Sequence, residues 1–128
     1  MVGYVDNIEE RTKENSSFRK VLYTGTHMQL VAMSLKPGED IGEEIHDHVD
    51  QFFRVEEGSA QVIIDGEEHS VEEDMVIIVP AGAKHNVINT SETEDLKLYT
   101  IYAPANHPEG TEHVTREEAM EAEEHHNS

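Results

Sequence analysis

The sequence contains no cysteine, few aromatic residues and no long apolar run. The absence of cysteine excludes disulfides and a thiolate metal site. No apolar segment approaches the roughly 18 residues of a membrane span. Residues 1–15 have neither the basic start nor the apolar segment of a signal peptide. We therefore expect a cytoplasmic protein with no membrane partner.

Basic residues are also scarce, because 9 Lys and Arg stand against 28 Asp and Glu and give a net charge of −19 at pH 7. A field of that sign repels nucleic acid and anionic membranes. It also disfavours polyanionic substrates unless the site itself is cationic. We expect no nucleic-acid partner, and the simplest interpretation of the charge is a well-solvated surface.

What the chain does contain is a series of short, strand-like segments separated by turn residues. They recur about every 8–12 residues, a spacing typical of an all-β sandwich or barrel. At 128 residues, the chain is expected to form one domain. The segments are residues 18–24, 28–35, 51–55, 60–64, 68–71, 75–79, 85–89 and 96–103.

Several local features of this pattern can be tested. The continuous apolar run Met75–Val79 predicts a strand buried on both faces, and Asp65-Gly66 predicts a type I′ hairpin turn. Short helices are expected within residues 6–15, where Asp6 is the candidate N-cap, and over Thr115–His126, which follows a capping pattern.

Two stretches carry candidate metal ligands. His46 and His48 are two residues apart, so on a β-strand they would point to one face and hold one ion. Gln51 follows them. His85, within the stretch PAGAKHNVIN, would complete the site from a neighbouring strand. Neutral imidazole is the ligand form of histidine and suits late first-row divalent metals.

The first of these stretches resembles the first motif of the cupin family. That motif is led by a glycine, followed by HxH, by a Glu three or four residues on, and by a glycine six residues later. His46, His48 and Gly58 match it, while Gln51 takes the place of the Glu and Asp40 that of the leading glycine. Glycines lie two residues to either side of Asp40.

The second stretch resembles the second cupin motif, a glycine followed by PxGxxHxxxN. Pro80, Gly82, His85 and Asn89 match this pattern, and Asp74 replaces the glycine. The resemblance implies a cupin double-stranded β-helix, or jelly-roll, barrel. In this all-β fold, residues 1–128 form one cupin domain with a core barrel over about 18–103. An acidic helical tail, with a short C-terminal helix, then covers about 104–128.

The resemblance also implies a metal centre of His46, His48, Gln51 and His85 that holds Mn, Fe, Co, Ni or Zn. The fourth ligand has a competitor. In an unbroken strand Asp50, and not Gln51, would share the face of the two histidines. A bend before the next strand would restore Gln51, whose spacing to Gly58 fits the motif.

The other histidines, including His107 and His113, have no ligand-like neighbours and are expected at the surface. Tyr99 and Tyr102 have opposite parity along one strand, so at most one faces the interior. Small cupins commonly pair through a sheet edge, and residues 18–24 are a reasonable edge for a homodimer.

Cupins include sugar and uronate isomerases, dioxygenases, decarboxylases, polyketide cyclases and non-enzymatic binders. We expect a metal-binding protein that acts as a Lewis acid on a small oxygenated metabolite, such as a sugar, keto acid or hydroxy acid. The alternatives are a non-catalytic, metal-dependent small-molecule binder and a dioxygenase or decarboxylase. A general base beside the metal would favour an enzyme, whereas a purely aliphatic lumen would favour a binder.

Overall fold

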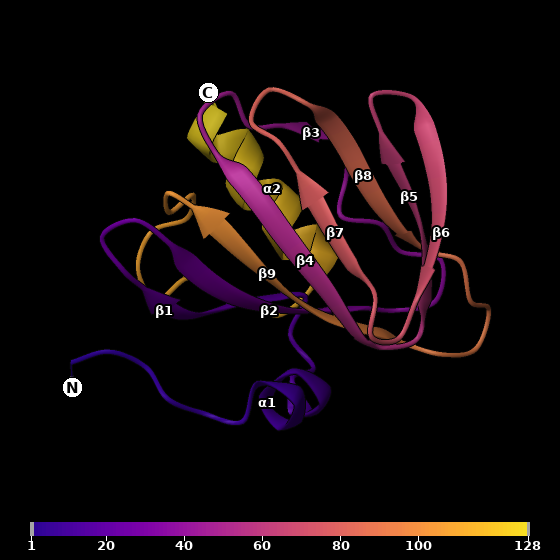
Figure 1. Ribbon diagram of the computed structural model, residues 1–128, viewed down its shortest axis with the longest axis horizontal. Helices are drawn as coiled ribbons and strands as arrows, with labels where there is room; N and C mark the ends of the chain where they lie inside the picture. The colour runs from indigo at the N-terminus through magenta and orange to yellow at the C-terminus, as the bar shows by residue number, and fades with distance from the viewer. Residues whose placement is uncertain (1, 128) are drawn as a thin grey trace.

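The structure, a computed structural model, describes residues 2–127 and consists of two antiparallel sheets with a helix at each end of the chain (Figure 1). One sheet has the strand order β10-β1-β2-β9-β4-β7, and the other has the order β3-β8-β5-β6. The elements are α1 Ile8–Glu14, β1 Arg19–Thr24, β2 Gln29–Leu35, β3 Glu44–Ile45, β4 Asp50–Glu57, β5 Ser59–Ile64, β6 Glu67–Glu72, β7 Val76–Val79, β8 Lys84–Asn89, β9 Leu96–Ala103, β10 Glu112–His113 and α2 Arg116–Asn127. The all-β prediction and the short C-terminal helix are both confirmed.

The core lies between the two sheets and is built by alternate residues of each strand. Phe53 and Val55 of β4 are fully buried. Phe52 points to the outer side of the sheet, where it is partly buried and contacts Tyr99. Tyr102 of β9 is buried and Tyr99 is only partly so, as their parity predicts. Alternation with a period of two residues therefore decides which side chains reach the interior.

The Asp65-Gly66 turn joins β5 to β6 as predicted. Both residues have positive φ, +47° for Asp65 and +85° for Gly66, as a type I′ turn requires. Helix α2 also begins as predicted, because Thr115 Oγ1 accepts a hydrogen bond of 3.1 Å from the Glu118 backbone N–H.

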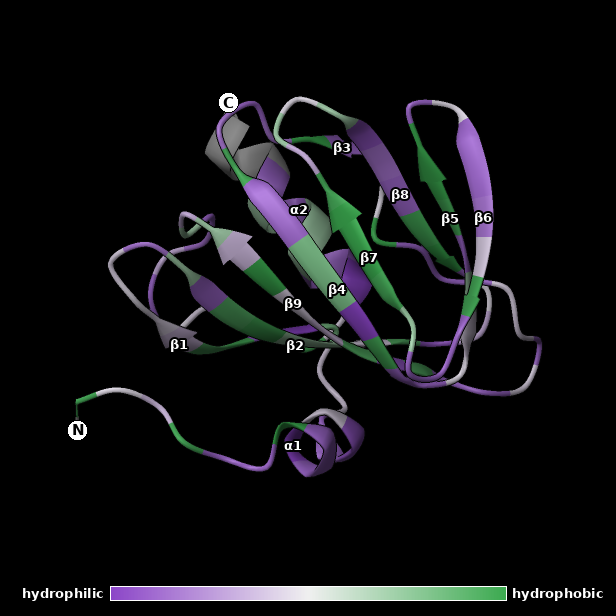
Figure 2. Cartoon of the chain, in the orientation of Figure 1, coloured by the Kyte–Doolittle hydropathy of each residue, from purple (hydrophilic) through white to green (hydrophobic). Residues whose placement is uncertain are grey.

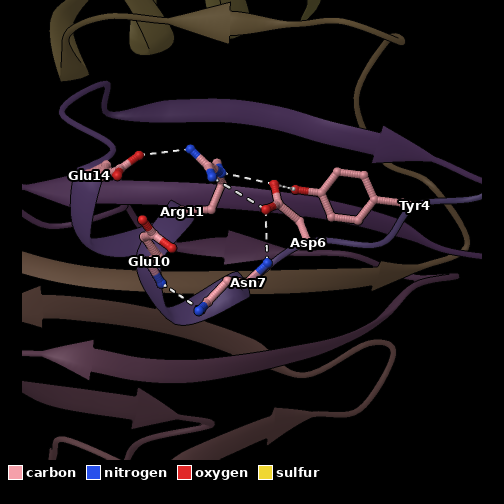
Figure 3. A network of polar contacts seen from close by, with 6 residues as sticks. All are labelled: Tyr4, Asp6, Asn7, Glu10, Arg11 and Glu14. Carbon is pink, nitrogen blue, oxygen red and sulfur yellow. Dashed lines mark hydrogen bonds and ion pairs between the residues drawn. The ribbon is translucent and has the colours of Figure 1, made fainter.

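The N-cap of α1 differs from the prediction by one residue (Figure 3). Asn7, and not Asp6, caps the helix, since its side chain accepts a hydrogen bond from the Glu10 N–H at 3.1 Å. Asp6 instead accepts from the Asn7 N–H and pairs with Arg11 at 2.8 Å. An aspartate and an asparagine side by side are equally good caps by type, so the sequence did not separate them.

The prediction that β7 is buried on both faces is wrong. Its inward residues Ile77 and Val79 are buried, but Val76 and Ile78 are 50% and 65% exposed. β7 is the last strand of its sheet, and only its inner side faces the second sheet. Figure 2 shows the apolar character of this strand against its more polar neighbours. A continuous apolar run thus marks an edge strand here, and its outer residues remain in contact with solvent.

The strand predicted to supply a dimer edge is partly covered within the chain. β1 pairs with β2 on one side, and Arg19 and Lys20 pair with His113 and Glu112 of β10 on the other. The homodimer stays a prediction, and any edge pairing through β1 would have to use its later residues. No helix in the described part of the chain is both long and apolar enough to cross a membrane.

Gly58, in the tight connection between β4 and β5, yields a stability prediction. Its φ is +96°, and a Cβ there would meet the Asp95 carbonyl oxygen at 2.9 Å. Gly58→Ala should therefore lose about 1–2 kcal/mol to the left-handed backbone, and a further 1–3 kcal/mol or so to overpacking. Gly66→Ala is the matched control, because its φ is +85° but nothing lies within 4 Å of the added Cβ. Urea unfolding should rank the Gly58 variant as the less stable, and equal losses would contradict the clash.

Candidate functional site

Three of the four predicted ligands turn their side chains into one end of the sandwich. His85 of β8 is 1% exposed, and Gln51 of β4 is also buried. His46 follows β3, and its ring centroid lies 5.5 Å from that of His85. His46 Nε2, His85 Nε2 and Gln51 Oε1 are all buried without a hydrogen-bond partner. Each is an atom that binds metals when it is unprotonated.

Glu44 belongs to the same cluster, although sequence reasoning missed it. It lies two residues before His46, so both side chains point to one face of the chain. It is also the direct cross-strand partner of His85 in the β3–β8 pair. Its Oε2 lies 3.2 Å from His46 Nε2, close enough for an ion pair but not aligned as a hydrogen bond.

The break between β3 and β4 puts Gln51, and not Asp50, on the interior side. β4 begins at Asp50, whose exposed carboxylate accepts a hydrogen bond of 2.9 Å from the Ala81 N–H. Gln51 faces inward, and its amide donates to Thr100 Oγ1 at 3.0 Å. That bond holds the amide so that its oxygen stays unpartnered in the interior.

His48 is not brought to this cluster. Its side chain is exposed, on the connection between β3 and β4. A two-residue shift of the first motif explains why: Gly38 then takes the place of the leading glycine, Glu44 and His46 that of HxH, and Gln51 follows after four residues. Six residues still separate Gln51 from Gly58. The displaced leading glycine was the signal that could have revealed this register.

The second motif lies where it was predicted, and a backbone hydrogen bond connects it to the first. The Gly82 N–H donates to the His46 carbonyl at 2.9 Å, which fixes the turn before His85 to the chain that carries His46. Asp74, where the motif has glycine, adopts a φ of +70°. Asn89 bonds the Leu35 and Glu94 carbonyls through its amide and thus serves the scaffold.

A pocket of about 470 Å³ opens beside the cluster. Glu44 and His46 belong to the cluster and also line the pocket. The rest of the wall includes Arg19, His107, His113 and Glu123, contributed by β1, the segment around β10 and α2. His107 and His113 were expected at the surface, yet both are partly buried here. No local pattern marked them, because long-range pairing of β1 with β10 brings them to the site.

Burial sets the protonation of the pocket. Burial, with the nearby Arg19, His113 and His46 charges, lowers the pKa of His107 to about 3. Burial likewise lowers the pKa of His85 and, with Arg19, that of His113. These three imidazoles are therefore neutral at pH 7. Burial raises the pKa of the Tyr102 phenol, which lies 3.2 Å from His107 Nε2.

One carboxyl group of the pocket shifts in the opposite direction. Burial, followed by repulsion from Glu44, raises the pKa of Glu123, although Arg19, His46 and Arg116 act against the shift. A carboxyl group with a raised pKa is a better proton donor near neutral pH. The pocket thus holds titratable groups and is not an aliphatic lumen.

The lowered pKa of His107 predicts a pH dependence of folding. The unfolded chain takes up this proton near pH 6.5, whereas the folded protein takes it up only near pH 3. Stability should therefore fall as the pH drops below about 6.5, by up to about 1.4 kcal/mol per pH unit from this group. Urea unfolding with a chelator present should show a shallower acid slope for His107→Gln. The control is His27→Gln, at an exposed histidine; equal slopes in wild type and His107→Gln would contradict the prediction.

Comparison with known proteins identifies the family. The cupin domain model matches residues 31–102. YrkC of Bacillus subtilis is 52% identical over 126 residues, which cover 94% of this chain and 67% of that protein. L612 of Acanthamoeba polyphaga mimivirus is 49% identical over 88% of this chain and 72% of its own length. The crystal structure of BH2720 from Bacillus halodurans superimposes with a TM-score of 0.90 at 49% identity, covering 92% of this chain and 93% of that one. The chain belongs to the cupin family.

Proposed function

We propose that this cupin binds a divalent first-row metal through Glu44, His46, Gln51 and His85, and acts on a small oxygenated metabolite in the adjoining pocket. The observation that carries the proposal is the set of three buried, unpartnered ligand atoms on His46, His85 and Gln51. Glu44 replaces the exposed His48 of the set expected from the sequence.

The donor set fits such an ion in kind. Two imidazoles, an amide oxygen and a carboxylate suit Mn, Fe, Co, Ni or Zn. Leaving a buried polar atom unsatisfied costs about 1–3 kcal/mol, and a bound cation would remove that cost at three atoms together. Glu44 would add the one negative charge of the set.

The side chains do not yet stand at ligand distances. Across the described residues, no three His, Asp, Glu or Cys side chains are close enough together to hold a metal. Gln51 lies on β4 of one sheet, and Glu44 and His85 lie on β3 and β8 of the other. With His46 just after β3, we expect side-chain rotation to complete the set. Glu44 has a long, flexible side chain, and its one ion pair among the described residues is with His46.

A metal bound there would act as a Lewis acid that polarises a carbonyl or hydroxyl oxygen. The chain's own residues supply the proton chemistry. Glu123 lines the pocket wall, and its raised pKa makes it the candidate proton donor. The Tyr102 hydroxyl lies 3.2 Å from Nε2 of His107, which lines the pocket. These titratable groups favour an enzyme over the alternative, a metal-dependent binding protein without turnover.

Metal affinity tests the ligand set. His46→Ala and His85→Ala should each weaken binding at least about 100-fold, the upper end of what loss of an outer-shell partner costs. Glu44→Gln should weaken it as well, because the site loses its only negative charge. Competition with a chromogenic chelator measures these affinities, with Mn, Fe, Co, Ni and Zn compared in turn.

His48→Ala is the matched control, since it removes an equivalent imidazole from the exposed side of the same segment. It should leave the affinity unchanged. A loss in His48→Ala as large as that in His46→Ala would restore the original set and rule out Glu44. All variants should keep the circular dichroism of a folded β protein, because the core is built by the strands.

A further inference from the structure

Arg19 is the largest fully buried side chain among the described residues. Its charge has no partner among them. The side chain is 0% exposed, on β1. Its Nε and Nη2 atoms have no hydrogen-bond partner, and its Nη1 has one weak contact, 3.4 Å from His113 Nδ1. The Phe18 ring centroid lies 5.4 Å from the guanidinium carbon. No carboxylate among the side chains that the structure describes forms an ion pair with it.

The two unpartnered nitrogens form one recognition edge. Nε–H and the adjacent Nη2–H of a guanidinium point the same way, and this fork matches the two oxygens of a carboxylate. Nη1 is directed to His113 on the neighbouring strand, which orients the guanidinium plane. Arg19 also lines the pocket beside Glu44 and His46. Arg19 is therefore a residue of the pocket wall, and the unused edge is itself shielded from solvent.

A purely structural role does not account for this arrangement. A buried charge costs several kcal/mol unless it is paired, and the carboxylates of the pocket do not pair with Arg19. Glu44 is turned to His46 at 3.2 Å. The pKa of Glu123 is raised despite the attraction of Arg19, so burial and Glu44 outweigh that attraction.

We propose that Arg19 binds the carboxylate of the substrate, and that the substrate is a small carboxylic acid with a further oxygen function. This deepens the function proposed above, on which it rests for the second oxygen. The net charge of −19 opposes anions, so an anionic substrate needs a local cation, and Arg19 supplies one.

Matched ligands test this assignment: lactate, its neutral amide lactamide, and inorganic phosphate. Calorimetric titration of the metal-free protein, in chelator at constant ionic strength, should show lactate binding at least about tenfold more tightly than lactamide. Arg19→Met should abolish that preference. Arg19→Lys keeps the charge but loses the fork, and should weaken lactate binding at least about tenfold.

Lys20→Met is the matched control. It removes one positive charge from the next residue of β1, whose side chain is exposed, and should keep the preference for lactate. Arg19→Met should unfold at the same temperature as wild type or higher, since no ion pair is lost. If Arg19→Met is too unstable to study, Arg19→Lys alone decides through its loss of affinity.

Three results would overturn the proposal: equal binding of lactate and lactamide by wild type, a preserved preference in Arg19→Met, or tighter binding of phosphate than of lactate. The last would assign a phosphate ester. The metal proposal fails separately, because the chelator arm contains no metal. An Arg19-dependent preference that survives in His46→Ala, with no metal bound by wild type, would refute the metal centre and leave the carboxylate site standing.

Discussion

Buried polar atoms that lack a partner are the constraint on which this structure depends. Of the seven such side-chain atoms among the described residues, five belong to Arg19, His46, Gln51 and His85. The other two are Thr12 Oγ1 and Asn86 Oδ1. Other buried polar groups are satisfied, as where Lys97 Nζ donates to the Asn15 carbonyl and Ser34 Oγ. Proteins usually satisfy buried groups and break that rule at functional sites. The cost is thus concentrated where a metal and an anion would remove it.

The burial that leaves these atoms without hydrogen-bond partners also shifts the pKa values of the histidines around them. It lowers the pKa values of His85, His107 and His113, which keeps the imidazoles neutral and their lone pairs free. Arg19 adds to the effect at His107 and His113. Protons therefore compete weakly with a ligand near neutral pH. The same lowered pKa values should make the folded state less stable in acid, because unfolding lets the imidazoles take up protons.

The sequence predicted the strands, the Asp65-Gly66 hairpin and the second motif, because each depends on local pattern. It misplaced the register of the first motif for a physical reason. Side chains alternate with a period of two, so a shift from Glu44 and His46 to His46 and His48 keeps every residue on the same face. Alternation alone does not detect that shift; the bend before β4 does. The exposed outer face of β7 was missed because an apolar run does not reveal whether a second layer covers it.

The pocket was beyond local reasoning because its parts come from both ends of the chain. Glu44, His46, Gln51 and His85 all lie within residues 31–102, the segment matched by the cupin domain. Arg19, His107, His113 and Glu123 lie outside that segment, yet they form the wall beside it. The β1–β10 pairing, with Arg19 opposite His113, and the docking of α2 assemble this wall. The family segment thus supplies the proposed ion site, and the flanking segments supply the charges that would select a substrate.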